Sequence, residues 1–144
     1  MAHKDAGNYR AKHGADKKLN RDIAQAIENR GVKGEIGCAE AGSIADELNV
    51  TMGEVGVAID LLELRIAKCQ IGLFGYGDKK TVIEPAGTVS AEMENAIRGA
   101  LVDGRLSCAT SWEIAQRFNV PKMHVAAACE ALKIRIKPCQ LGAF

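Results

Sequence analysis

Two stretches of the chain, IADELNVTMGEVGVA at residues 44–58 and IAQRFNVPKMHVAAA at residues 114–128, follow one pattern of apolar, small and turn-forming residues. They lie 70 positions apart in the sequence. The alignment between them extends without a gap over 34–74 and 104–144, where 16 of 41 positions are identical. Chance does not produce such agreement, so the sequence indicates an internal duplication with two structurally equivalent units.

Each stretch has the pattern of two helices joined by a tight turn. Asn49 and Asn119 stand at the turn, where the backbone favours positive φ, and Asn is among the non-glycine residues that tolerate this conformation best. Ala45 and Ala115 are small, which allows the second helix to cross close to the first. The remaining apolar positions lock the pair against a preceding helix. We therefore predict a helix-turn-helix in both units.

The flanking residues extend this prediction to the rest of each unit. Asn20 and Ser90 are good N-caps for a first helix, and each is followed by apolar residues at helical spacing. Gly72, Gly75 and Gly77 predict a hairpin and its exit. The remaining expectations are an extended segment at 35–38 or 105–108, a helix at 43–48 or 112–118, a longer helix through 63 or 133, and a strand at 64–66 or 134–136.

A helix, a short strand, a helix-turn-helix and a hairpin together make each unit similar to the winged-helix family. The resemblance covers 20–74 and 90–144. It implies a mainly α fold with short β hairpins (α+β), arranged as two tandem winged-helix units. We expect a basic, flexible N-terminal arm at 1–19, in which His13 is solvated, and a linker at 75–89.

The charge is distributed unevenly between the two units. Residues 22–74 carry nine acidic and four basic side chains, whereas residues 92–144 carry seven basic and five acidic ones. In winged-helix proteins the second helix of the motif usually enters the major groove, so the resemblance implies a small regulator of transcription that binds duplex DNA mainly through its second unit. The basic arm would add sequence-independent affinity. The predicted DNA-binding residues are Arg117, Lys122, Met123, His124, Lys133, Arg135, Lys137, Lys17 and Lys18.

The second helix of the first unit departs from a DNA-reading pattern. It offers no basic residue, and it carries Glu54 and Asp60, which would face phosphates unfavourably. Its predicted outward positions are small or apolar and suit close packing against protein: Met52, Gly53, Gly56 and Val57. The rival interpretation is therefore a protein-interaction or dimerisation module, in which this helix contacts a partner or a second copy of the chain.

Four cysteines recur at equivalent positions of the two units: Cys38, Cys108, Cys69 and Cys139. Thiolates bind zinc and iron–sulfur clusters, but two ligands per unit make an incomplete site, and no histidine recurs beside them. We interpret them as small buried hydrophobic residues, with a metal site or a redox pair as the alternatives, and expect no cofactor. No Ser/His/Asp, Cys/His or paired-carboxylate arrangement repeats, so we expect no enzyme.

The sequence shows no sign of a membrane or secretory segment. No apolar run approaches the length of about 18 residues that a spanning helix needs. Residues 1–21 are polar and lack the apolar core of a secretory signal. We therefore expect a cytoplasmic protein with no membrane partner.

Overall fold

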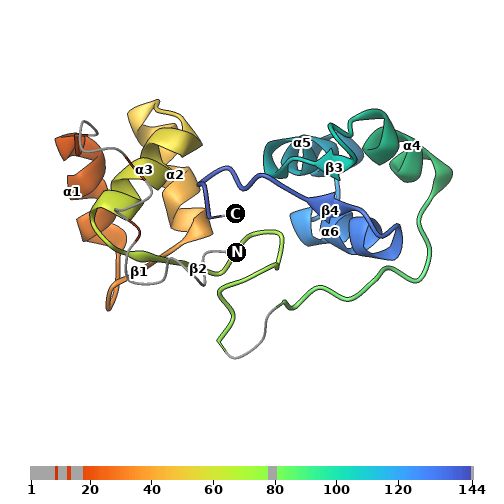
Figure 1. Ribbon diagram of the computed structural model, residues 1–144, viewed down its shortest axis with the longest axis horizontal. Coiled ribbons are helices and arrows are strands. Elements are labelled where there is room, and N and C mark those ends of the chain that lie inside the picture. Colours follow the sequence, from red (N-terminus) through yellow and green to blue (C-terminus); the bar gives the residue numbers. More distant parts are fainter. Residues whose placement is uncertain (1–8, 10–12, 14–17, 78–80, 144) are drawn as a thin grey trace. The chain divides into compact units, whose positions relative to one another are not determined.

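The computed structural model describes residues 9, 13, 18–77 and 81–143. In these residues the chain is mainly helical, with six helices and four short strands (Figure 1). It divides into two compact units, which we describe separately. Unit 1 is Met1–Cys69 with Gln140–Phe144, and unit 2 is Gln70–Cys139. The predicted mainly α fold with short strands is therefore confirmed.

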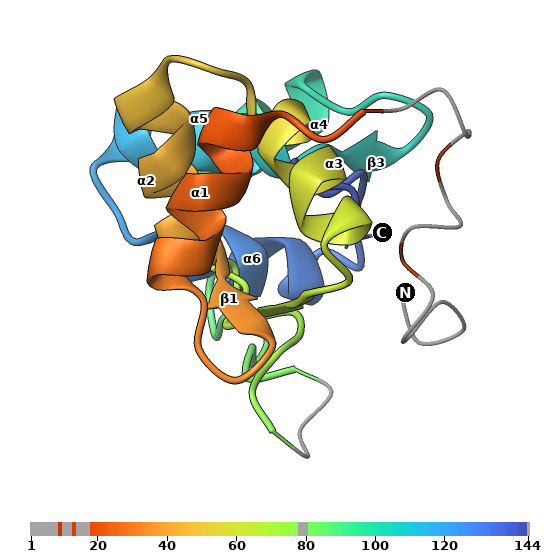
Figure 2. The same cartoon turned by 90° about the vertical axis from the view of Figure 1, so that its left-hand side faces the viewer.

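Unit 1 is built from three helices and a two-stranded sheet (Figure 2). Its elements in chain order are α1 (Arg21–Arg30), β1 (Glu35–Gly37), α2 (Cys38–Leu48), α3 (Met52–Leu61) and β2 (Arg65–Ala67). Because α1 contacts both α2 and α3, the three helices enclose a common core. The large side chains buried there are those of Ile23, Ile27, Ile36, Ile44 and Ile59.

Unit 2 repeats this order of elements. They are α4 (Ala91–Gly99), β3 (Arg105–Leu106), α5 (Cys108–Phe118), α6 (Lys122–Ala131) and β4 (Arg135–Ile136). α4 contacts α5 and α6, as α1 contacts α2 and α3. The buried side chains of unit 2 include Ile97, Leu106, Val125 and Cys129. Each helix and strand of unit 1 therefore has a counterpart at the aligned position of unit 2.

The local signals for helix starts and turns are confirmed. The Asn20 side chain accepts a hydrogen bond from the third residue of α1 at 3.1 Å, and Ser90 does the same for α4 at 3.1 Å. Asn49 ends α2 at φ 54° and ψ 47°, and Asn119 ends α5 at φ 53° and ψ 47°. Both lie in the left-handed region, which most side chains avoid and Asn tolerates.

The second helix of each unit begins earlier than predicted. α2 begins at Cys38 and α5 at Cys108, rather than at 43 and 112. In unit 2 the Ser107 hydroxyl accepts a hydrogen bond from the backbone N–H of Thr110 at 3.1 Å, which fixes the start of α5. The prediction of a longer third helix is wrong, because α3 and α6 have 10 residues each and α2 and α5 have 11.

The strands pair in a way that the winged-helix pattern does not predict. β1 pairs with β2 in parallel, with Glu35 opposite Arg65, and β3 pairs with β4 in the same manner. Parallel strands need a crossover connection, and the two intervening helices provide it. Within the described residues no strand follows β2 or β4 as a hairpin partner, so the hairpin predicted at 72–77 is wrong.

A tight turn precedes the first strand of each unit. In unit 1, Val32 and Glu35 exchange backbone hydrogen bonds of 2.8 and 3.0 Å across Lys33 and Gly34, which both have positive φ. Two residues of positive φ between paired residues make a type I′ turn. Val102 and Arg105 form the same turn in unit 2.

The segment that follows the last strand of each repeat belongs to the other unit. Gln70 and the residues after it lie in unit 2, whereas Gln140–Phe144 lies in unit 1. In unit 2, Ile71 is fully buried, and the carbonyl of Gly72 accepts a hydrogen bond from the backbone N–H of Val82 at 2.9 Å. The compact units therefore differ from the predicted domains 20–74 and 90–144, and residues 70–77 and 81–89 are part of unit 2.

Candidate functional site

The face of α3 that the sequence predicts to be outward is covered by the C-terminal segment. Gly56 is buried, and Leu141 lies against it within unit 1. A Cβ added at Gly56 would overlap the carbonyl oxygen of Leu141 and lie 2.8 Å from its carbonyl carbon. Glycine is required here because another stretch of backbone approaches the helix closely. The prediction that Gly56 contacts a partner protein is therefore wrong: it contacts the protein's own chain.

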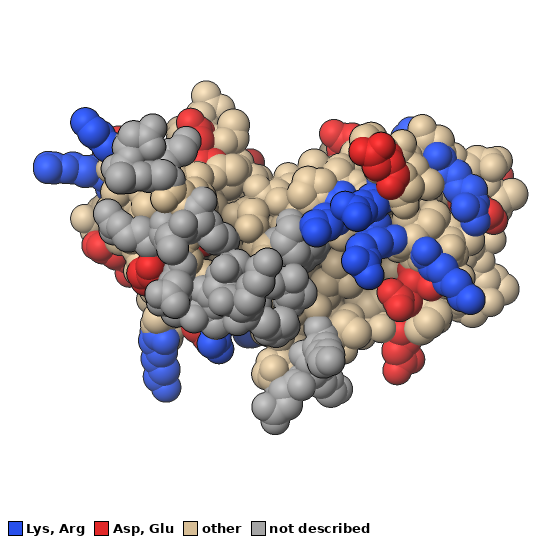
Figure 3. All heavy atoms as spheres, viewed as in Figure 1, with Lys and Arg blue, Asp and Glu red and all other residues tan. Residues whose placement is uncertain are grey.

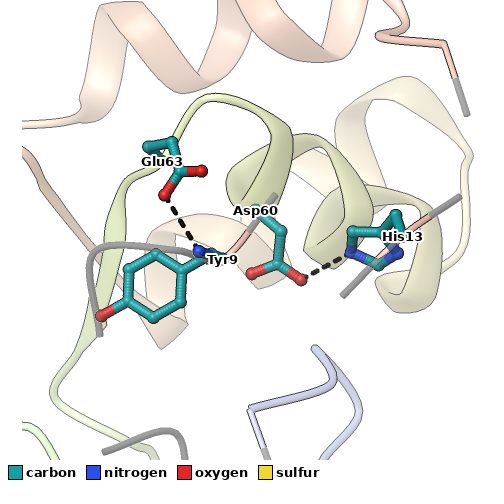
Figure 4. Close-up of polar contacts among 4 residues, drawn as sticks. All are labelled: Tyr9, His13, Asp60 and Glu63. Carbon is teal, nitrogen blue, oxygen red and sulfur yellow. Dashed lines mark hydrogen bonds and ion pairs between the residues drawn. The ribbon is translucent and has the colours of Figure 1, made fainter. Parts of the chain in front are cut away.

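Two described residues of the N-terminal segment also lie on α3 and the turn after it (Figure 4). The backbone N–H of Tyr9 donates to Glu63 Oε2 at 2.9 Å, and His13 Nε2 lies 2.8 Å from Asp60 Oδ2. Asp60 is 4% exposed, and a buried carboxylate needs such hydrogen bonds. His13 is therefore half-buried and bonded rather than solvated as predicted.

This cover leaves little of α3 for a partner. Among the predicted interface residues, Gly53 is exposed, and Met52 and Val57 are half-buried. The Glu54 side chain is engaged at the N-terminus of the helix, where it accepts a hydrogen bond from the backbone N–H of Thr51 at 2.7 Å. The second helix of a DNA-reading motif needs a free outer face. α3 does not offer one.

α6, the equivalent helix of unit 2, is also partly covered. Ala126, which aligns with Gly56, is buried. The carbonyl of the next residue, Ala127, accepts a hydrogen bond from the backbone N–H of Ala86 at 3.0 Å. The segment before α4 therefore lies against the middle of α6, at residues that align with Gly56 and Val57 of α3.

The first turn of α6 holds three predicted DNA-binding residues in different surroundings. Lys122 is half-buried, with its Nζ 4.7 Å from the centroid of the Trp112 ring, a cation–π contact. Met123 is half-buried, and His124 is exposed. Base edges are read by several convergent donors and acceptors. With His124 as its exposed polar group, this turn has little capacity for base reading.

The other predicted residues of unit 2 are exposed: Arg117, Lys133, Arg135 and Lys137. On the side of unit 2 seen in Figure 3, Lys and Arg side chains gather over β4 and the end of α6, with acidic groups beside them. Along 133–137 exposed and buried residues alternate. Arg135 and Lys137, two positions apart on extended backbone, share one side, whereas Lys133 is exposed in the turn before β4, with φ 58°. In the N-terminal segment, Lys18 is exposed, and Lys17 lies outside the described residues.

Sequence reasoning missed one residue of this surface, Arg105. It is exposed in β3 and stands directly opposite Arg135 in the sheet. The aligned pair in unit 1 is Glu35 and Arg65, so the charge change is visible in the alignment. That this change places two arginines side by side follows only from the parallel pairing of β3 with β4, which the sequence does not predict. We call Arg105, Lys133, Arg135 and Lys137 the basic face.

The cysteines are thiols that pack in or beside the two cores. Cys38, Cys69, Cys108 and Cys129 are buried, and Cys139 is half-buried. Burial, with a smaller effect of the Glu130 charge, raises the pKa of Cys129 from 9.0 to about 11. Among the described residues, no group of three or more His, Cys, Asp and Glu side chains is placed to hold a metal ion.

Comparisons with protein-family models, curated proteins and solved structures find no match to this chain. In the part of the chain that the structure describes, no helix is both long and apolar enough to cross a membrane. A function for the protein therefore has to be argued from the geometry of its two units.

Proposed function

We propose that the protein binds duplex DNA through the basic face of unit 2 and contacts phosphates rather than base edges. The observation that carries this proposal is that Lys133, Arg135 and Lys137 are all exposed within five consecutive residues, whose other two, Ile134 and Ile136, are buried. Each basic side chain that neutralises a phosphate releases condensed counterions, and this provides affinity without reading sequence.

The cover on α3 and α6 supports this mode of binding over insertion of a helix into the major groove. In this proposal each unit is a helix-turn-helix domain related to winged helices, in which terminal or linking segments occupy the helix face that would enter the groove. The protein would then act as a small DNA-binding regulator with little sequence preference. The N-terminal segment, with Lys18 exposed, would add further phosphate contacts.

The proposal is tested by fluorescence anisotropy with two labelled duplexes of unrelated sequence, between about 50 and about 200 mM salt. The wild type should bind both duplexes with similar affinity. Changing Lys133→Glu together with Lys137→Glu should lower the slope of log affinity against log salt by about two.

The matched control is Lys68→Glu, because Lys68 is an exposed lysine that follows β2 in unit 1. It should leave both affinity and slope unchanged. Absence of binding at the lowest salt, or an equal loss in the Lys68 variant, would contradict the proposal.

Protein interaction is the second candidate function, and a different observation favours it. Val32 and Val102 occupy the same place in the two tight turns and are 67% and 72% exposed. Single exposed apolar residues are common, but an exposed valine at the same position of both units would allow each unit to make the same contact with a protein partner. Sedimentation equilibrium of the wild type and of Val32→Asp with Val102→Asp tests self-association. A wild type that stays monomeric at all concentrations would count against it.

A further inference from the structure

The register of the β3–β4 sheet places two arginines side by side. Arg105 is the residue directly opposite Arg135, and Leu106 is opposite Ile136. Paired residues of parallel strands about 4.8 Å apart project to the same face of the sheet. Because Leu106 and Ile136 are buried, both arginines project to the solvent side, where both are exposed.

The same rung in unit 1 has a different charge pattern. There Glu35 stands opposite Arg65, and both are exposed. Opposite charges on neighbouring strands attract, whereas like charges directly opposite each other destabilise a sheet. Unit 2 therefore keeps an unfavourable pair at a position where unit 1 has a favourable one. Among the described residues, no ion pair joins Arg105 or Arg135 to a carboxylate.

A third basic group continues the same face. The backbone N–H of Lys137 donates to the carbonyl of Leu106 at 2.8 Å, which extends the parallel pairing beyond β4. Lys137 follows Arg135 by two positions, and both are exposed on either side of buried Ile136. Side chains two positions apart on an extended strand lie on one face. The aligned residue in unit 1 is Ala67, so this charge too is confined to unit 2.

We propose that Arg105, Arg135 and Lys137 form a binding site for one phosphate group, which in the complex with DNA is a backbone phosphodiester. An anion held between the two guanidinium groups would convert their repulsion into attraction, because each guanidinium offers a planar fork of N–H donors that fits phosphate oxygens. This site rests on the proposed DNA binding for its physiological ligand. Its affinity for phosphate itself is a separate property of the three side chains.

The decisive variant is Arg105→Glu, which recreates in unit 2 the Glu–Arg rung of unit 1. In chloride buffer at low salt it should raise the melting temperature, because it replaces repulsion by attraction. It should also weaken DNA binding by about tenfold and lower the salt slope by at least one. The reciprocal control, Glu35→Arg, should lower the melting temperature. An Arg105→Glu protein that is less stable than wild type but folded, and binds DNA equally well, would overturn the site.

A second measurement uses inorganic phosphate and separates this site from the proposed function. At equal ionic strength, phosphate should raise the melting temperature relative to chloride by more in the wild type than in Arg135→Gln, which keeps only the general stabilisation by a kosmotropic anion. DNA binding that is insensitive to Arg105→Glu and Arg135→Gln, but is weakened by Lys133→Glu with Lys137→Glu, would remove the site and leave the proposed function standing. If phosphate stabilises the wild type through Arg135 but the protein does not bind DNA, the phosphate site stands and the proposed function is removed. Trp112 fluorescence, which reports on unit 2, verifies that the Arg105 and Arg135 variants are folded, and far-UV circular dichroism does so for Glu35→Arg in unit 1.

Discussion

Replacing Gly56 by alanine should displace the C-terminal segment from α3. The added methyl group would overlap the backbone of Leu141 and lie 2.8 Å from its carbonyl carbon and 3.0 Å from its Cα. Backbone atoms cannot turn aside as the end of a flexible side chain does. The overlap is relieved when the C-terminal segment moves away from α3, and this movement exposes Leu141 to water.

The size of the effect follows from two opposing contributions. Leu141 is 2% exposed, and burial of a leucine side chain contributes about 1.5–3 kcal/mol. Alanine is the better helix former by about 0.5–1 kcal/mol. We therefore expect the free energy of unfolding to fall by about 1–2 kcal/mol. Gly53 lies on the same helix, and a Cβ there would meet nothing closer than Thr51 Oγ1 at 3.8 Å, so Gly53→Ala should stabilise the protein by about 0.5 kcal/mol.

Urea unfolding followed by far-UV circular dichroism measures both variants against the wild type. A second pair of variants is made in a chain that ends at Cys139, where no segment remains to be displaced. In that chain Gly56→Ala should behave like Gly53→Ala and become stabilising. If Gly56→Ala is already as stable as Gly53→Ala in the full chain, then the packing of Leu141 against α3 does not determine the free energy of unfolding of the Gly56 variant.

Three further predictions concern other positions. Asn49→Ala should cost about 1 kcal/mol while Asn49→Gly is near neutral, because the residue has φ 54°; equal stabilities in urea would contradict this. His13→Ala should lower the free energy of unfolding by about 1 kcal/mol, because buried Asp60 loses a donor, and an unchanged urea midpoint would show that this contact adds nothing. Because the pKa of Cys129 is raised from 9.0 to about 11, the unfolded thiol loses its proton first, so stability should fall as pH rises through this window. In urea unfolding, Cys129→Ala should reduce this fall of the free energy of unfolding with pH. If the fall is unchanged, other titrating groups cause it.

The features predicted correctly from sequence are those fixed by a few neighbouring residues. The caps at Asn20 and Ser90 and the left-handed turn at Asn49 depend on interactions within a span of four residues. The start of α2 was missed because Gly37 caps it without a side-chain hydrogen bond, and because Gly42 interrupts the apolar spacing. A helix start that lacks a side-chain cap leaves no local signal in the sequence.

The features that were missed depend on residues far apart in the chain. Apolar spacing shows that Gly56 lies opposite the core of a helix-turn-helix, but nothing local indicates that Leu141 covers it. The hairpin was predicted from glycines that instead serve turns, such as Gly72 with φ 77°. The place of Arg105 beside Arg135 depends on the parallel pairing of β3 with β4, which joins residues 30 positions apart. Sequence reasoning located most of the basic face and could not foresee which surfaces the chain itself covers.

The assignment of Gln140–Phe144 to unit 1 bears on how this protein can be divided. A gene fragment cut at the repeat boundary, 20–74, would lack the segment that covers α3 and would keep residues that belong to unit 2. A self-sufficient version of unit 1 would instead join the residues up to Cys69 to Gln140–Phe144 through a flexible linker. The portion of this chain that can be transplanted into another protein is therefore defined by packing, and its ends do not coincide with those of the repeat.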